Sequence, residues 1–246
     1  MRMNLSVLNP NKDPMGAAIL AYQQTGKAGK IRVLSSMFDE DEIDVPYLFR
    51  DRNAMPMLEQ QALDLARGWI LDVGAGAGCH ALALQEMRQD VSAIDISPLS
   101  VQAMQARGVH DVRCINFFDP RVGGPYDTIL LLMNGSGIIG TLRNMPQFFA
   151  QIRSLLCEDG QILMDSSDLR YLYENEDGTY DIDPTGPYYG EIDYQMVYEN
   201  VKGDKFDWLY IDFDTLRMLA GLNGFNCEKV AEGEHYDYLA RLTFKD

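Results

Sequence analysis

The chain has 246 residues, 46% of them hydrophobic, with 21 Lys plus Arg against 37 Asp plus Glu and a formal net charge of −16. This length suits one α/β domain with an added cap. So acidic a surface repels phosphates, which argues against a nucleic-acid partner. No stretch is long and apolar enough to span a bilayer and no signal sequence opens the chain, so we expect a cytoplasmic protein without a membrane partner. The four cysteines are widely spaced, which favours reduced thiols and predicts no metal site.

Residues 1–67 predict a helical cap. Pro14 suits the first turn of a short helix, and a short strand is expected over 31–34. The acidic segment 39–44 is interpreted as a loop, which is either simply solvated or selects a cationic or amine substrate. A second helix begins at Pro56 and precedes the core.

Residues 68–246 predict an α/β core. Apolar runs alternate with helix-forming segments, which indicates a doubly wound, mostly parallel sheet with helices on both faces. A Tyr-rich insertion with an antiparallel hairpin interrupts the core at about 169–211, and its tyrosines form either an aromatic lid or a self-packed loop. The strands are expected at 69–73, 90–94, 112–116, 126–133, 161–165, 225–231 and 236–244, and the helices at 79–88, 98–107, 144–156 and 215–223.

A glycine-rich loop follows the first core strand. The segment Leu71-Asp72-Val73-Gly74-Ala75-Gly76-Ala77-Gly78 ends in a helix, and Asp95 ends the next strand 17 residues after Gly78. Glycines are needed where a ligand lies against bare backbone and where φ is positive. A carboxylate at the end of the second strand can accept hydrogen bonds from both ribose hydroxyls. The pattern therefore predicts an adenosine-type cofactor.

The sequence of the same loop distinguishes between two candidate cofactors, NAD and S-adenosylmethionine (SAM). A dinucleotide fingerprint would need its third glycine at position 79, which is Cys79. The carboxylate of Asp72 would also repel a pyrophosphate beside the helix N-terminus. SAM carries a sulfonium and an ammonium and has no phosphate, so Asp72 is compatible with it. The sequence favours SAM over NAD.

From Trp69 to about Asp168 the chain resembles the class I SAM-dependent methyltransferases. Segment 71–78 matches the first motif of that family and Ala93-Ile94-Asp95-Ile96-Ser97 its ribose-binding motif, while Asn116-Phe117-Phe118 stands where the family contacts adenine. Segments 126–132 and 160–165 resemble its fourth and fifth strands. The resemblance implies a seven-stranded sheet of order 3-2-1-4-5-7-6 with an antiparallel last strand.

Ligands of an open parallel sheet bind at the carboxyl ends of its strands. Arg50 is expected either to pair with the methionine carboxylate of SAM or to form a surface ion pair. The helix dipole should disfavour protonation of His80, which we expect beneath the methionine moiety. The predicted cofactor residues are Asp72, Gly74, Ala75, Gly76, Gly78, His80, Asp95, Ile96, Asn116, Phe117, Met133 and Asn134. The predicted substrate residues are Tyr22, Arg50, Asp165, Asp168 and Tyr236.

Methyl transfer requires chiefly that the acceptor be held in line behind the methyl group, and a base is needed only if the acceptor must lose a proton. The resemblance places Asn134 facing the methyl group. Met133-Asn134-Gly135-Ser136 stands in place of the Asn/Asp-Pro-Pro-Tyr signature, which argues against methylation of adenine, cytosine or glutamine nitrogens. His235 is the best-placed candidate base, with a purely structural turn residue as the alternative.

We therefore predict a SAM-dependent methyltransferase that acts on a small molecule. The sparse catalytic constellation leaves a non-catalytic SAM-binding or sensing protein as an alternative, and a protein methyltransferase is a further one. An NAD(P)-dependent oxidoreductase is a third, opposed by Cys79, by Asp72 and by the long segment before the glycine loop.

Overall fold

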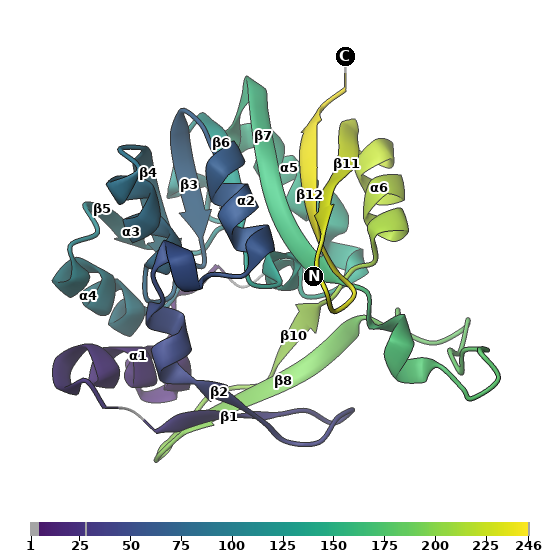
Figure 1. Cartoon of the computed structure of the whole chain (residues 1–246), viewed down its shortest axis with the longest axis horizontal. Coiled ribbons are helices and arrows are strands. Elements are labelled where there is room, and N and C mark those ends of the chain that lie inside the picture. Colours follow the sequence, from purple (N-terminus) through teal and green to yellow (C-terminus); the bar gives the residue numbers. More distant parts are fainter. Residues whose placement is uncertain (1–4, 28, 246) are drawn as a thin grey trace.

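The computed structural model describes residues 5–27 and 29–245. Its larger sheet has seven strands in the order β11-β12-β7-β6-β3-β4-β5 (Figure 1). Neighbours from β5 to β7 are parallel, while β12 is antiparallel to both β7 and β11. Numbered along the chain within this sheet, the strands run 3-2-1-4-5-7-6, so the predicted fold is confirmed. The strands are β3 (Trp69–Val73), β4 (Asp90–Asp95), β5 (Asp111–Cys114), β6 (Tyr126–Leu131), β7 (Leu156–Ser167), β11 (Phe225–Glu232) and β12 (Asp237–Phe244).

Helices cover both faces of this sheet because its parallel strands are apolar on both sides. Leu71 and Ile129 pack toward α5 and α6, whereas Ile70 and Leu130 pack toward α2, α3 and α4. None of the helices in the described part of the chain is long and apolar enough to cross a bilayer. These helices are α2 (Met57–Leu65), α3 (Cys79–Glu86), α4 (Pro98–Arg107), α5 (Met145–Leu155) and α6 (Phe213–Leu222).

A second sheet of five strands joins two segments that are distant in the sequence. Strand β1 of the N-terminal segment pairs with β8 of the Tyr-rich insertion, and the sheet runs β10-β8-β1-β2 with β9 beside β8. We call this sheet the cap sheet. Its strands are β1 (Lys30–Leu34), β2 (Asp41–Asp44), β8 (Glu191–Tyr198), β9 (Val201–Lys202) and β10 (Phe206–Leu209).

The acidic segment, expected to be a loop, forms strand β2 over Asp41–Asp44. Its low β-propensity is outweighed by pairing with β1, where Lys30 Nζ lies 2.6 Å from Glu42 Oε2. Arg32 binds Glu40 in the adjoining turn at 2.5 Å. The acidity of this segment is therefore partly neutralised by cations of the neighbouring strand.

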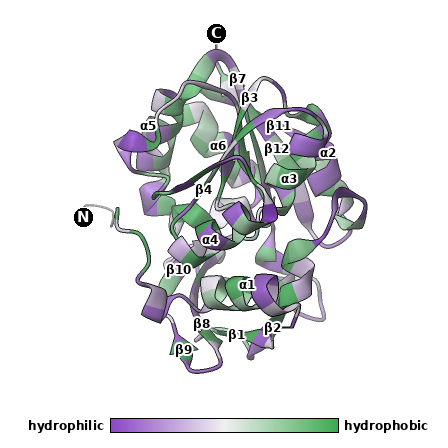
Figure 2. Ribbon diagram, turned by 90° about the vertical axis from the view of Figure 1, so that its left-hand side faces the viewer, coloured by the Kyte–Doolittle hydropathy of each residue, from purple (hydrophilic) through white to green (hydrophobic). Residues whose placement is uncertain are grey.

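Helix α1 (Pro14–Thr25) lies between the core and the cap sheet (Figure 2). Ala18 and Ile19 are buried in one apolar cluster with Ile31 and Tyr198 of the cap sheet and with Ala103 of α4. The carboxyl ends of the core strands point toward this cap (Figure 1). The predicted site residues therefore lie at the edge where core and cap meet.

Short 3-10 helices connect these elements. They are η1 (Pro10–Lys12), η2 (Val45–Phe49), η3 (Arg52–Ala54), η4 (Pro120–Val122), η5 (Gly135–Ile139), η6 (Leu142–Asn144) and η7 (Leu169–Tyr173).

Candidate active site

The glycine loop between β3 and α3 presents bare backbone. Gly74, Gly76 and Gly78 have φ values of +69°, +55° and +82°. A Cβ added at Gly74 would meet no heavy atom within 4 Å, and one at Gly76 would meet only Gly74 O at 3.9 Å. A Cβ at Gly78 would instead lie 2.9 Å from Met104 Cγ, so this glycine is required for helix packing. The first two glycines leave open space in which a ligand can lie against the chain.

Asp95 faces this loop from the end of β4. Its Oδ2 accepts a hydrogen bond from Gly76 N at 2.8 Å and its Oδ1 one from Ser97 N at 2.8 Å. Burial raises the pKa of Asp95 to about 6, against the effect of these two bonds. Because a carboxylate oxygen can accept two hydrogen bonds, each oxygen retains capacity for a hydroxyl donor. Ile96, half-buried beside it, accepts a bond from Leu8 N.

Asp72 lies behind the loop and is 1% exposed. Burial raises its pKa, and its Oδ2 has no hydrogen-bond partner among the described residues. A buried acceptor without a partner is uncommon in folded proteins, and it marks a place where a donor from a ligand or solvent fits. Ala75 is 6% exposed, and it belongs to the apolar cluster that includes residues of α2, α3 and α4.

Of the two residues predicted to contact adenine after β5, Phe117 is buried and Asn116 is half-buried. The ring of Phe117 is 1% exposed and lies 6.0 Å from the ring of Phe148 inside the core. It is therefore not available as a surface for adenine. Asn116 is half-buried at the strand end, where its Oδ1 accepts a bond from Phe118 N at 2.9 Å. Phe117 and Phe118 lie in the turn after β5, and both are buried in the same apolar cluster.

The loop after β6 is strained and is held by Asp165. Met133 and Asn134 both have left-handed backbone, with φ of 65° and 56°. Asp165 accepts bonds from Met133 N at 3.1 Å and Gly135 N at 2.9 Å, and burial raises its pKa to about 7. Ser167 Oγ donates to Asn134 Oδ1 at 2.9 Å. Consecutive left-handed residues without glycine are costly, and such strain is concentrated at functional sites.

Arg50 and His80 meet at a residue that the sequence analysis missed. Glu59 Oε2 lies 2.5 Å from Arg50 Nη2 and 2.8 Å from His80 Nε2, and all three side chains are at most 6% exposed. The ion pair of Arg50 is therefore buried and not at the surface, while its pairing with the methionine carboxylate of SAM stays a prediction. The available signal was the position of Glu59 in α2, where it falls on the same helical face as Ala62 and Leu63.

The prediction that His80 resists protonation is wrong. Burial does oppose its charge, but Cys79, Glu59 and Asp72 together raise the pKa of His80 well above its usual value. The helix dipole is outweighed because two of these neighbours are carboxylates brought from other elements.

Arg107 of α4, another residue that the sequence analysis did not select, contacts both the glycine loop and Phe49 of η2. Arg107 Nη1 donates to Ala77 O at 2.5 Å, and its guanidinium lies 4.6 Å from the ring of Phe49. Tyr22 of α1 also packs against Phe49, with ring centroids 4.6 Å apart. Tyr22 is therefore fixed at the boundary between cap and core.

The remaining predicted residues cluster near the end of β7. Asp168 is bound by Arg170 Nη2 at 2.6 Å and by Tyr189 Oη at 2.8 Å. Tyr236 is 62% exposed, and its ring stacks on Tyr171 at 4.6 Å. His235 is exposed in the turn between β11 and β12, where its backbone N–H donates to Asp237 Oδ1 at 2.9 Å. Asp168 N donates to Tyr236 O at 2.9 Å, which joins this turn to β7.

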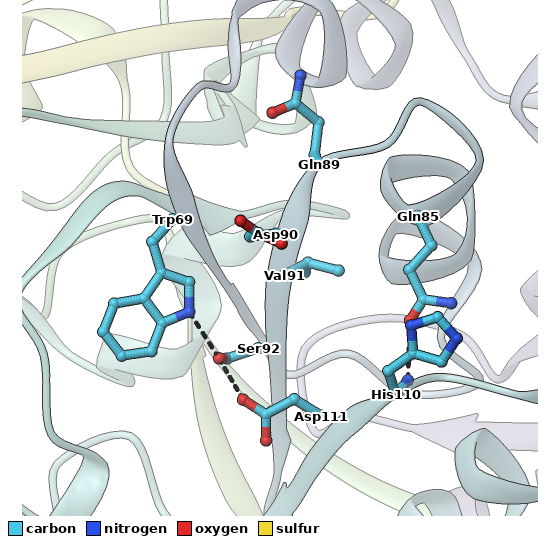
Figure 3. A pocket seen from close by; sticks show the side chains of 8 residues that line it. All are labelled: Trp69, Gln85, Gln89, Asp90, Val91, Ser92, His110 and Asp111. Atoms are coloured by element: carbon cyan, nitrogen blue, oxygen red, sulfur yellow. Dashed lines mark hydrogen bonds between the residues drawn. The ribbon is translucent and has the colours of Figure 1, made fainter.

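A hollow of about 410 Å³ lies at the opposite edge of the sheet, beside the first residues of β3 and β4 (Figure 3). Trp69 Nε1 donates to Ser92 Oγ at 3.0 Å, and Ser92 Oγ donates in turn to Asp111. The hollow contains none of the predicted site residues. Ligands of parallel α/β sheets bind at the carboxyl edge, so we assign the site to the glycine loop.

Among the solved structures similar to this chain is a full-length match of high identity. The crystal structure of a SAM-dependent methyltransferase from Bacteroides fragilis, in complex with S-adenosyl-L-homocysteine, is 60% identical over 100% of both chains, with a TM-score of 0.94. The CcbJ methyltransferase from Streptomyces caelestis matches over 78% of this chain and 91% of its own, at 15% identity and a TM-score of 0.61. A SAM-dependent methyltransferase from Clostridium acetobutylicum matches over 75% and 87%, at 12% identity and a TM-score of 0.56.

The two more distant matches show the shared fold alone. No family model matches the chain, and no curated protein matches it. The 60% identity over the full length, together with the class I topology, is decisive for the family. The chain belongs to the SAM-dependent methyltransferases, as the glycine loop and its resemblance predicted.

Proposed function

We propose that the enzyme binds SAM across Gly74–Gly78 and Asp95 and transfers its methyl group to a small molecule held between the ends of β6 and β7 and the cap sheet. The observation that carries the proposal is the bare backbone at Gly74 and Gly76, directly beside the carboxylate of Asp95. The S-adenosyl-L-homocysteine of the Bacteroides fragilis structure supports it.

Each residue has a definite task in this arrangement. Asp95 accepts the two ribose hydroxyls, and the buried Oδ2 of Asp72 attracts the ammonium group. The sulfonium of SAM supplies an activated methyl group with a neutral thioether as leaving group. Asp165 holds the Met133–Asn134 backbone at the strand end, where Asn134 can orient the acceptor.

The cap supports a small acceptor. The cap sheet and α1 stand across the carboxyl edge of the core (Figure 1). The cap also carries Tyr194 and Tyr210, which are hydrogen-bonded to each other at 3.1 Å, and small-molecule sites are typically lined by aromatic side chains with a few polar groups. A polymer would need an open groove at this edge, and a chain of net charge −16 repels nucleic acids.

The experiment measures S-adenosylhomocysteine released from SAM in the presence of three sets of acceptors. The sets are small molecules with amine, phenol, thiol or carboxylate groups, unmodified peptides, and short RNA and DNA. We expect turnover with a member of the first set and none with an Asp95→Ala variant. Turnover restricted to peptides or nucleic acid would contradict the acceptor class.

A further inference from the structure

We infer that Glu59 is a positioning residue for the cofactor, because its single carboxylate ties the cap segment at Arg50 to the helix that follows the glycine loop at His80. The inference rests on the proposed function, since it assigns the cofactor to that loop. Glu59 itself lies on α2, whereas Arg50 follows η2 and His80 lies in α3.

The two partners contact the same oxygen of Glu59. Glu59 Oε2 is 2.5 Å from Arg50 Nη2 and 2.8 Å from His80 Nε2. Arg50 Nη1 donates to Tyr47 O at 2.8 Å, and its guanidinium lies 4.3 Å from the ring of Tyr47. His80 stands two residues after Gly78, in the first turn of α3. One carboxylate thus fixes the end of η2 and the start of α3 relative to each other.

Stability alone does not account for this group. The side chains of Arg50, Glu59 and His80 are 3%, 5% and 6% exposed. Removing charges from water costs several kcal/mol per ion, and buried ion pairs rarely exceed well-packed apolar contacts in net stability. Leu58, Ala62 and Leu63 already provide such contacts between α2 and the core. What an ion pair adds is direction, because charged hydrogen bonds fix distance and angle.

A second ion pair, between α2 and the short helix η3 that precedes it, provides the comparison. Arg52 Nη2 of η3 lies 2.5 Å from Asp64 Oδ1 of α2, and these side chains are 32% and 54% exposed. Exposed pairs of this kind contribute little to stability or geometry. Asp64→Asn is therefore a control that removes a carboxylate from the same helix without altering the buried group.

The charge of His80 depends on groups from four elements. Glu59 of α2, Asp72 of β3, Cys79 of α3 and Asp165 of β7 all interact with its ring, and Arg50 lies beyond Glu59. Without the charge on Glu59, burial and the nearby guanidinium both favour the neutral imidazole. The loss of the carboxylate should therefore be visible as a fall in the pKa of His80.

The test compares wild type, Glu59→Gln, His80→Gln, the double variant and Asp64→Asn by calorimetric titration with S-adenosylhomocysteine. Gln has nearly the shape of Glu, but it removes the charge and replaces one acceptor oxygen with an NH2 donor. We expect each single variant at Glu59 and His80 to weaken binding about tenfold or more, and Asp64→Asn to stay within about twofold. The double variant should lose little more than either single one, because both remove the same link. Titration of His80 by NMR should show a lowered pKa in Glu59→Gln.

The outcomes separate the two proposals. Binding stoichiometry reports the folded fraction, so misfolding lowers stoichiometry while a positioning defect raises Kd. If Glu59→Gln and His80→Gln are folded and bind as tightly as wild type, the positioning role is overturned and Glu59 is only structural. If Glu59→Gln does not fold, an affinity of His80→Gln equal to that of wild type is by itself enough to overturn the positioning role. Absence of binding by wild type would instead refute the proposed function.

Discussion

The carboxylate of Asp95 and the backbone N–H of Gly76 are joined by a hydrogen bond of 2.8 Å. This bond connects the end of β4 to the glycine loop after β3, so the two halves of the proposed nucleoside site are already assembled by the protein itself. A preassembled site pays less ordering entropy when the cofactor binds.

Cofactor affinity should fall in acid. Burial raises the pKa of Asp95 from 3.8 to about 6, and only the ionised carboxylate can accept both ribose hydroxyls. If the ionised form alone binds, affinity for S-adenosylhomocysteine at pH 5 should be about tenfold lower than at pH 7. Calorimetry across this range measures it. Asp95→Asn should bind S-adenosylhomocysteine weakly at every pH. If its affinity instead changed with pH as that of wild type does, the titrating group would be a residue other than Asp95.

Gly74→Ala should impair binding without a matching loss of stability. Its added methyl enters the space where the cofactor is proposed to lie, since no protein atom is within 4 Å of that position. Gly26→Ala is the control: Gly26 has a φ of +68° against +69° for Gly74, and its Cβ also meets nothing within 4 Å. Each should lose roughly 1 kcal/mol of unfolding free energy from left-handed strain.

Titration with S-adenosylhomocysteine distinguishes the two glycine variants. Gly74→Ala should bind at least about tenfold more weakly, while Gly26→Ala should match wild type. Equal affinity in both variants would mean that no ligand lies against Gly74.

Asp165→Asn should change the pH dependence of stability in a defined direction. The pKa of Asp165 is raised from 3.8 to about 7 on folding, so the folded state holds this proton more tightly. The resulting stabilisation is complete below the unfolded pKa and is lost as pH rises through about 7. The Tm of wild type should therefore fall relative to Asp165→Asn between pH 4 and pH 7. A Tm difference that is constant with pH would show that Asp165 does not titrate in this window.

Gly137 links the core to the cap sheet by close packing. A Cβ at Gly137 would lie 1.8 Å from Trp208 Cε2, on β10. Gly137→Ala should therefore destabilise the protein by about 1–3 kcal/mol, measured by urea unfolding followed through tryptophan fluorescence. Trp208→Leu should partly restore the stability of that variant. If Trp208→Leu does not restore stability to Gly137→Ala, the destabilisation does not come from a clash between the added methyl group and Trp208.

Local patterns were sufficient to predict the core and the cofactor loop. Ser97 caps α4 by accepting from Ser100 N, and Gly108 ends that helix in left-handed conformation, as the sequence indicates. The glycine loop and Asp95 are likewise separated by one helix and one strand, so their proximity follows from the βαβ geometry. The sheet order came from the resemblance to a known family rather than from these patterns.

Contacts between distant segments could not be predicted in this way. Arg32 of β1 pairs with Val197 of β8 across most of the chain, and nothing in either short segment specifies its partner. Glu59 was overlooked because a charged residue in a helix ordinarily faces solvent. The protonation of His80 was misjudged for the same reason, since its partner Glu59 lies on another helix.

The crystal structure of this enzyme with S-adenosylhomocysteine tests the central claim most directly. We predict both ribose hydroxyls within about 3 Å of the Asp95 carboxylate oxygens and the methionine portion against Gly74–Gly76. A nucleoside bound elsewhere, for example in the hollow beside Trp69, or an Asp95 carboxylate turned away from the ribose, would contradict the account.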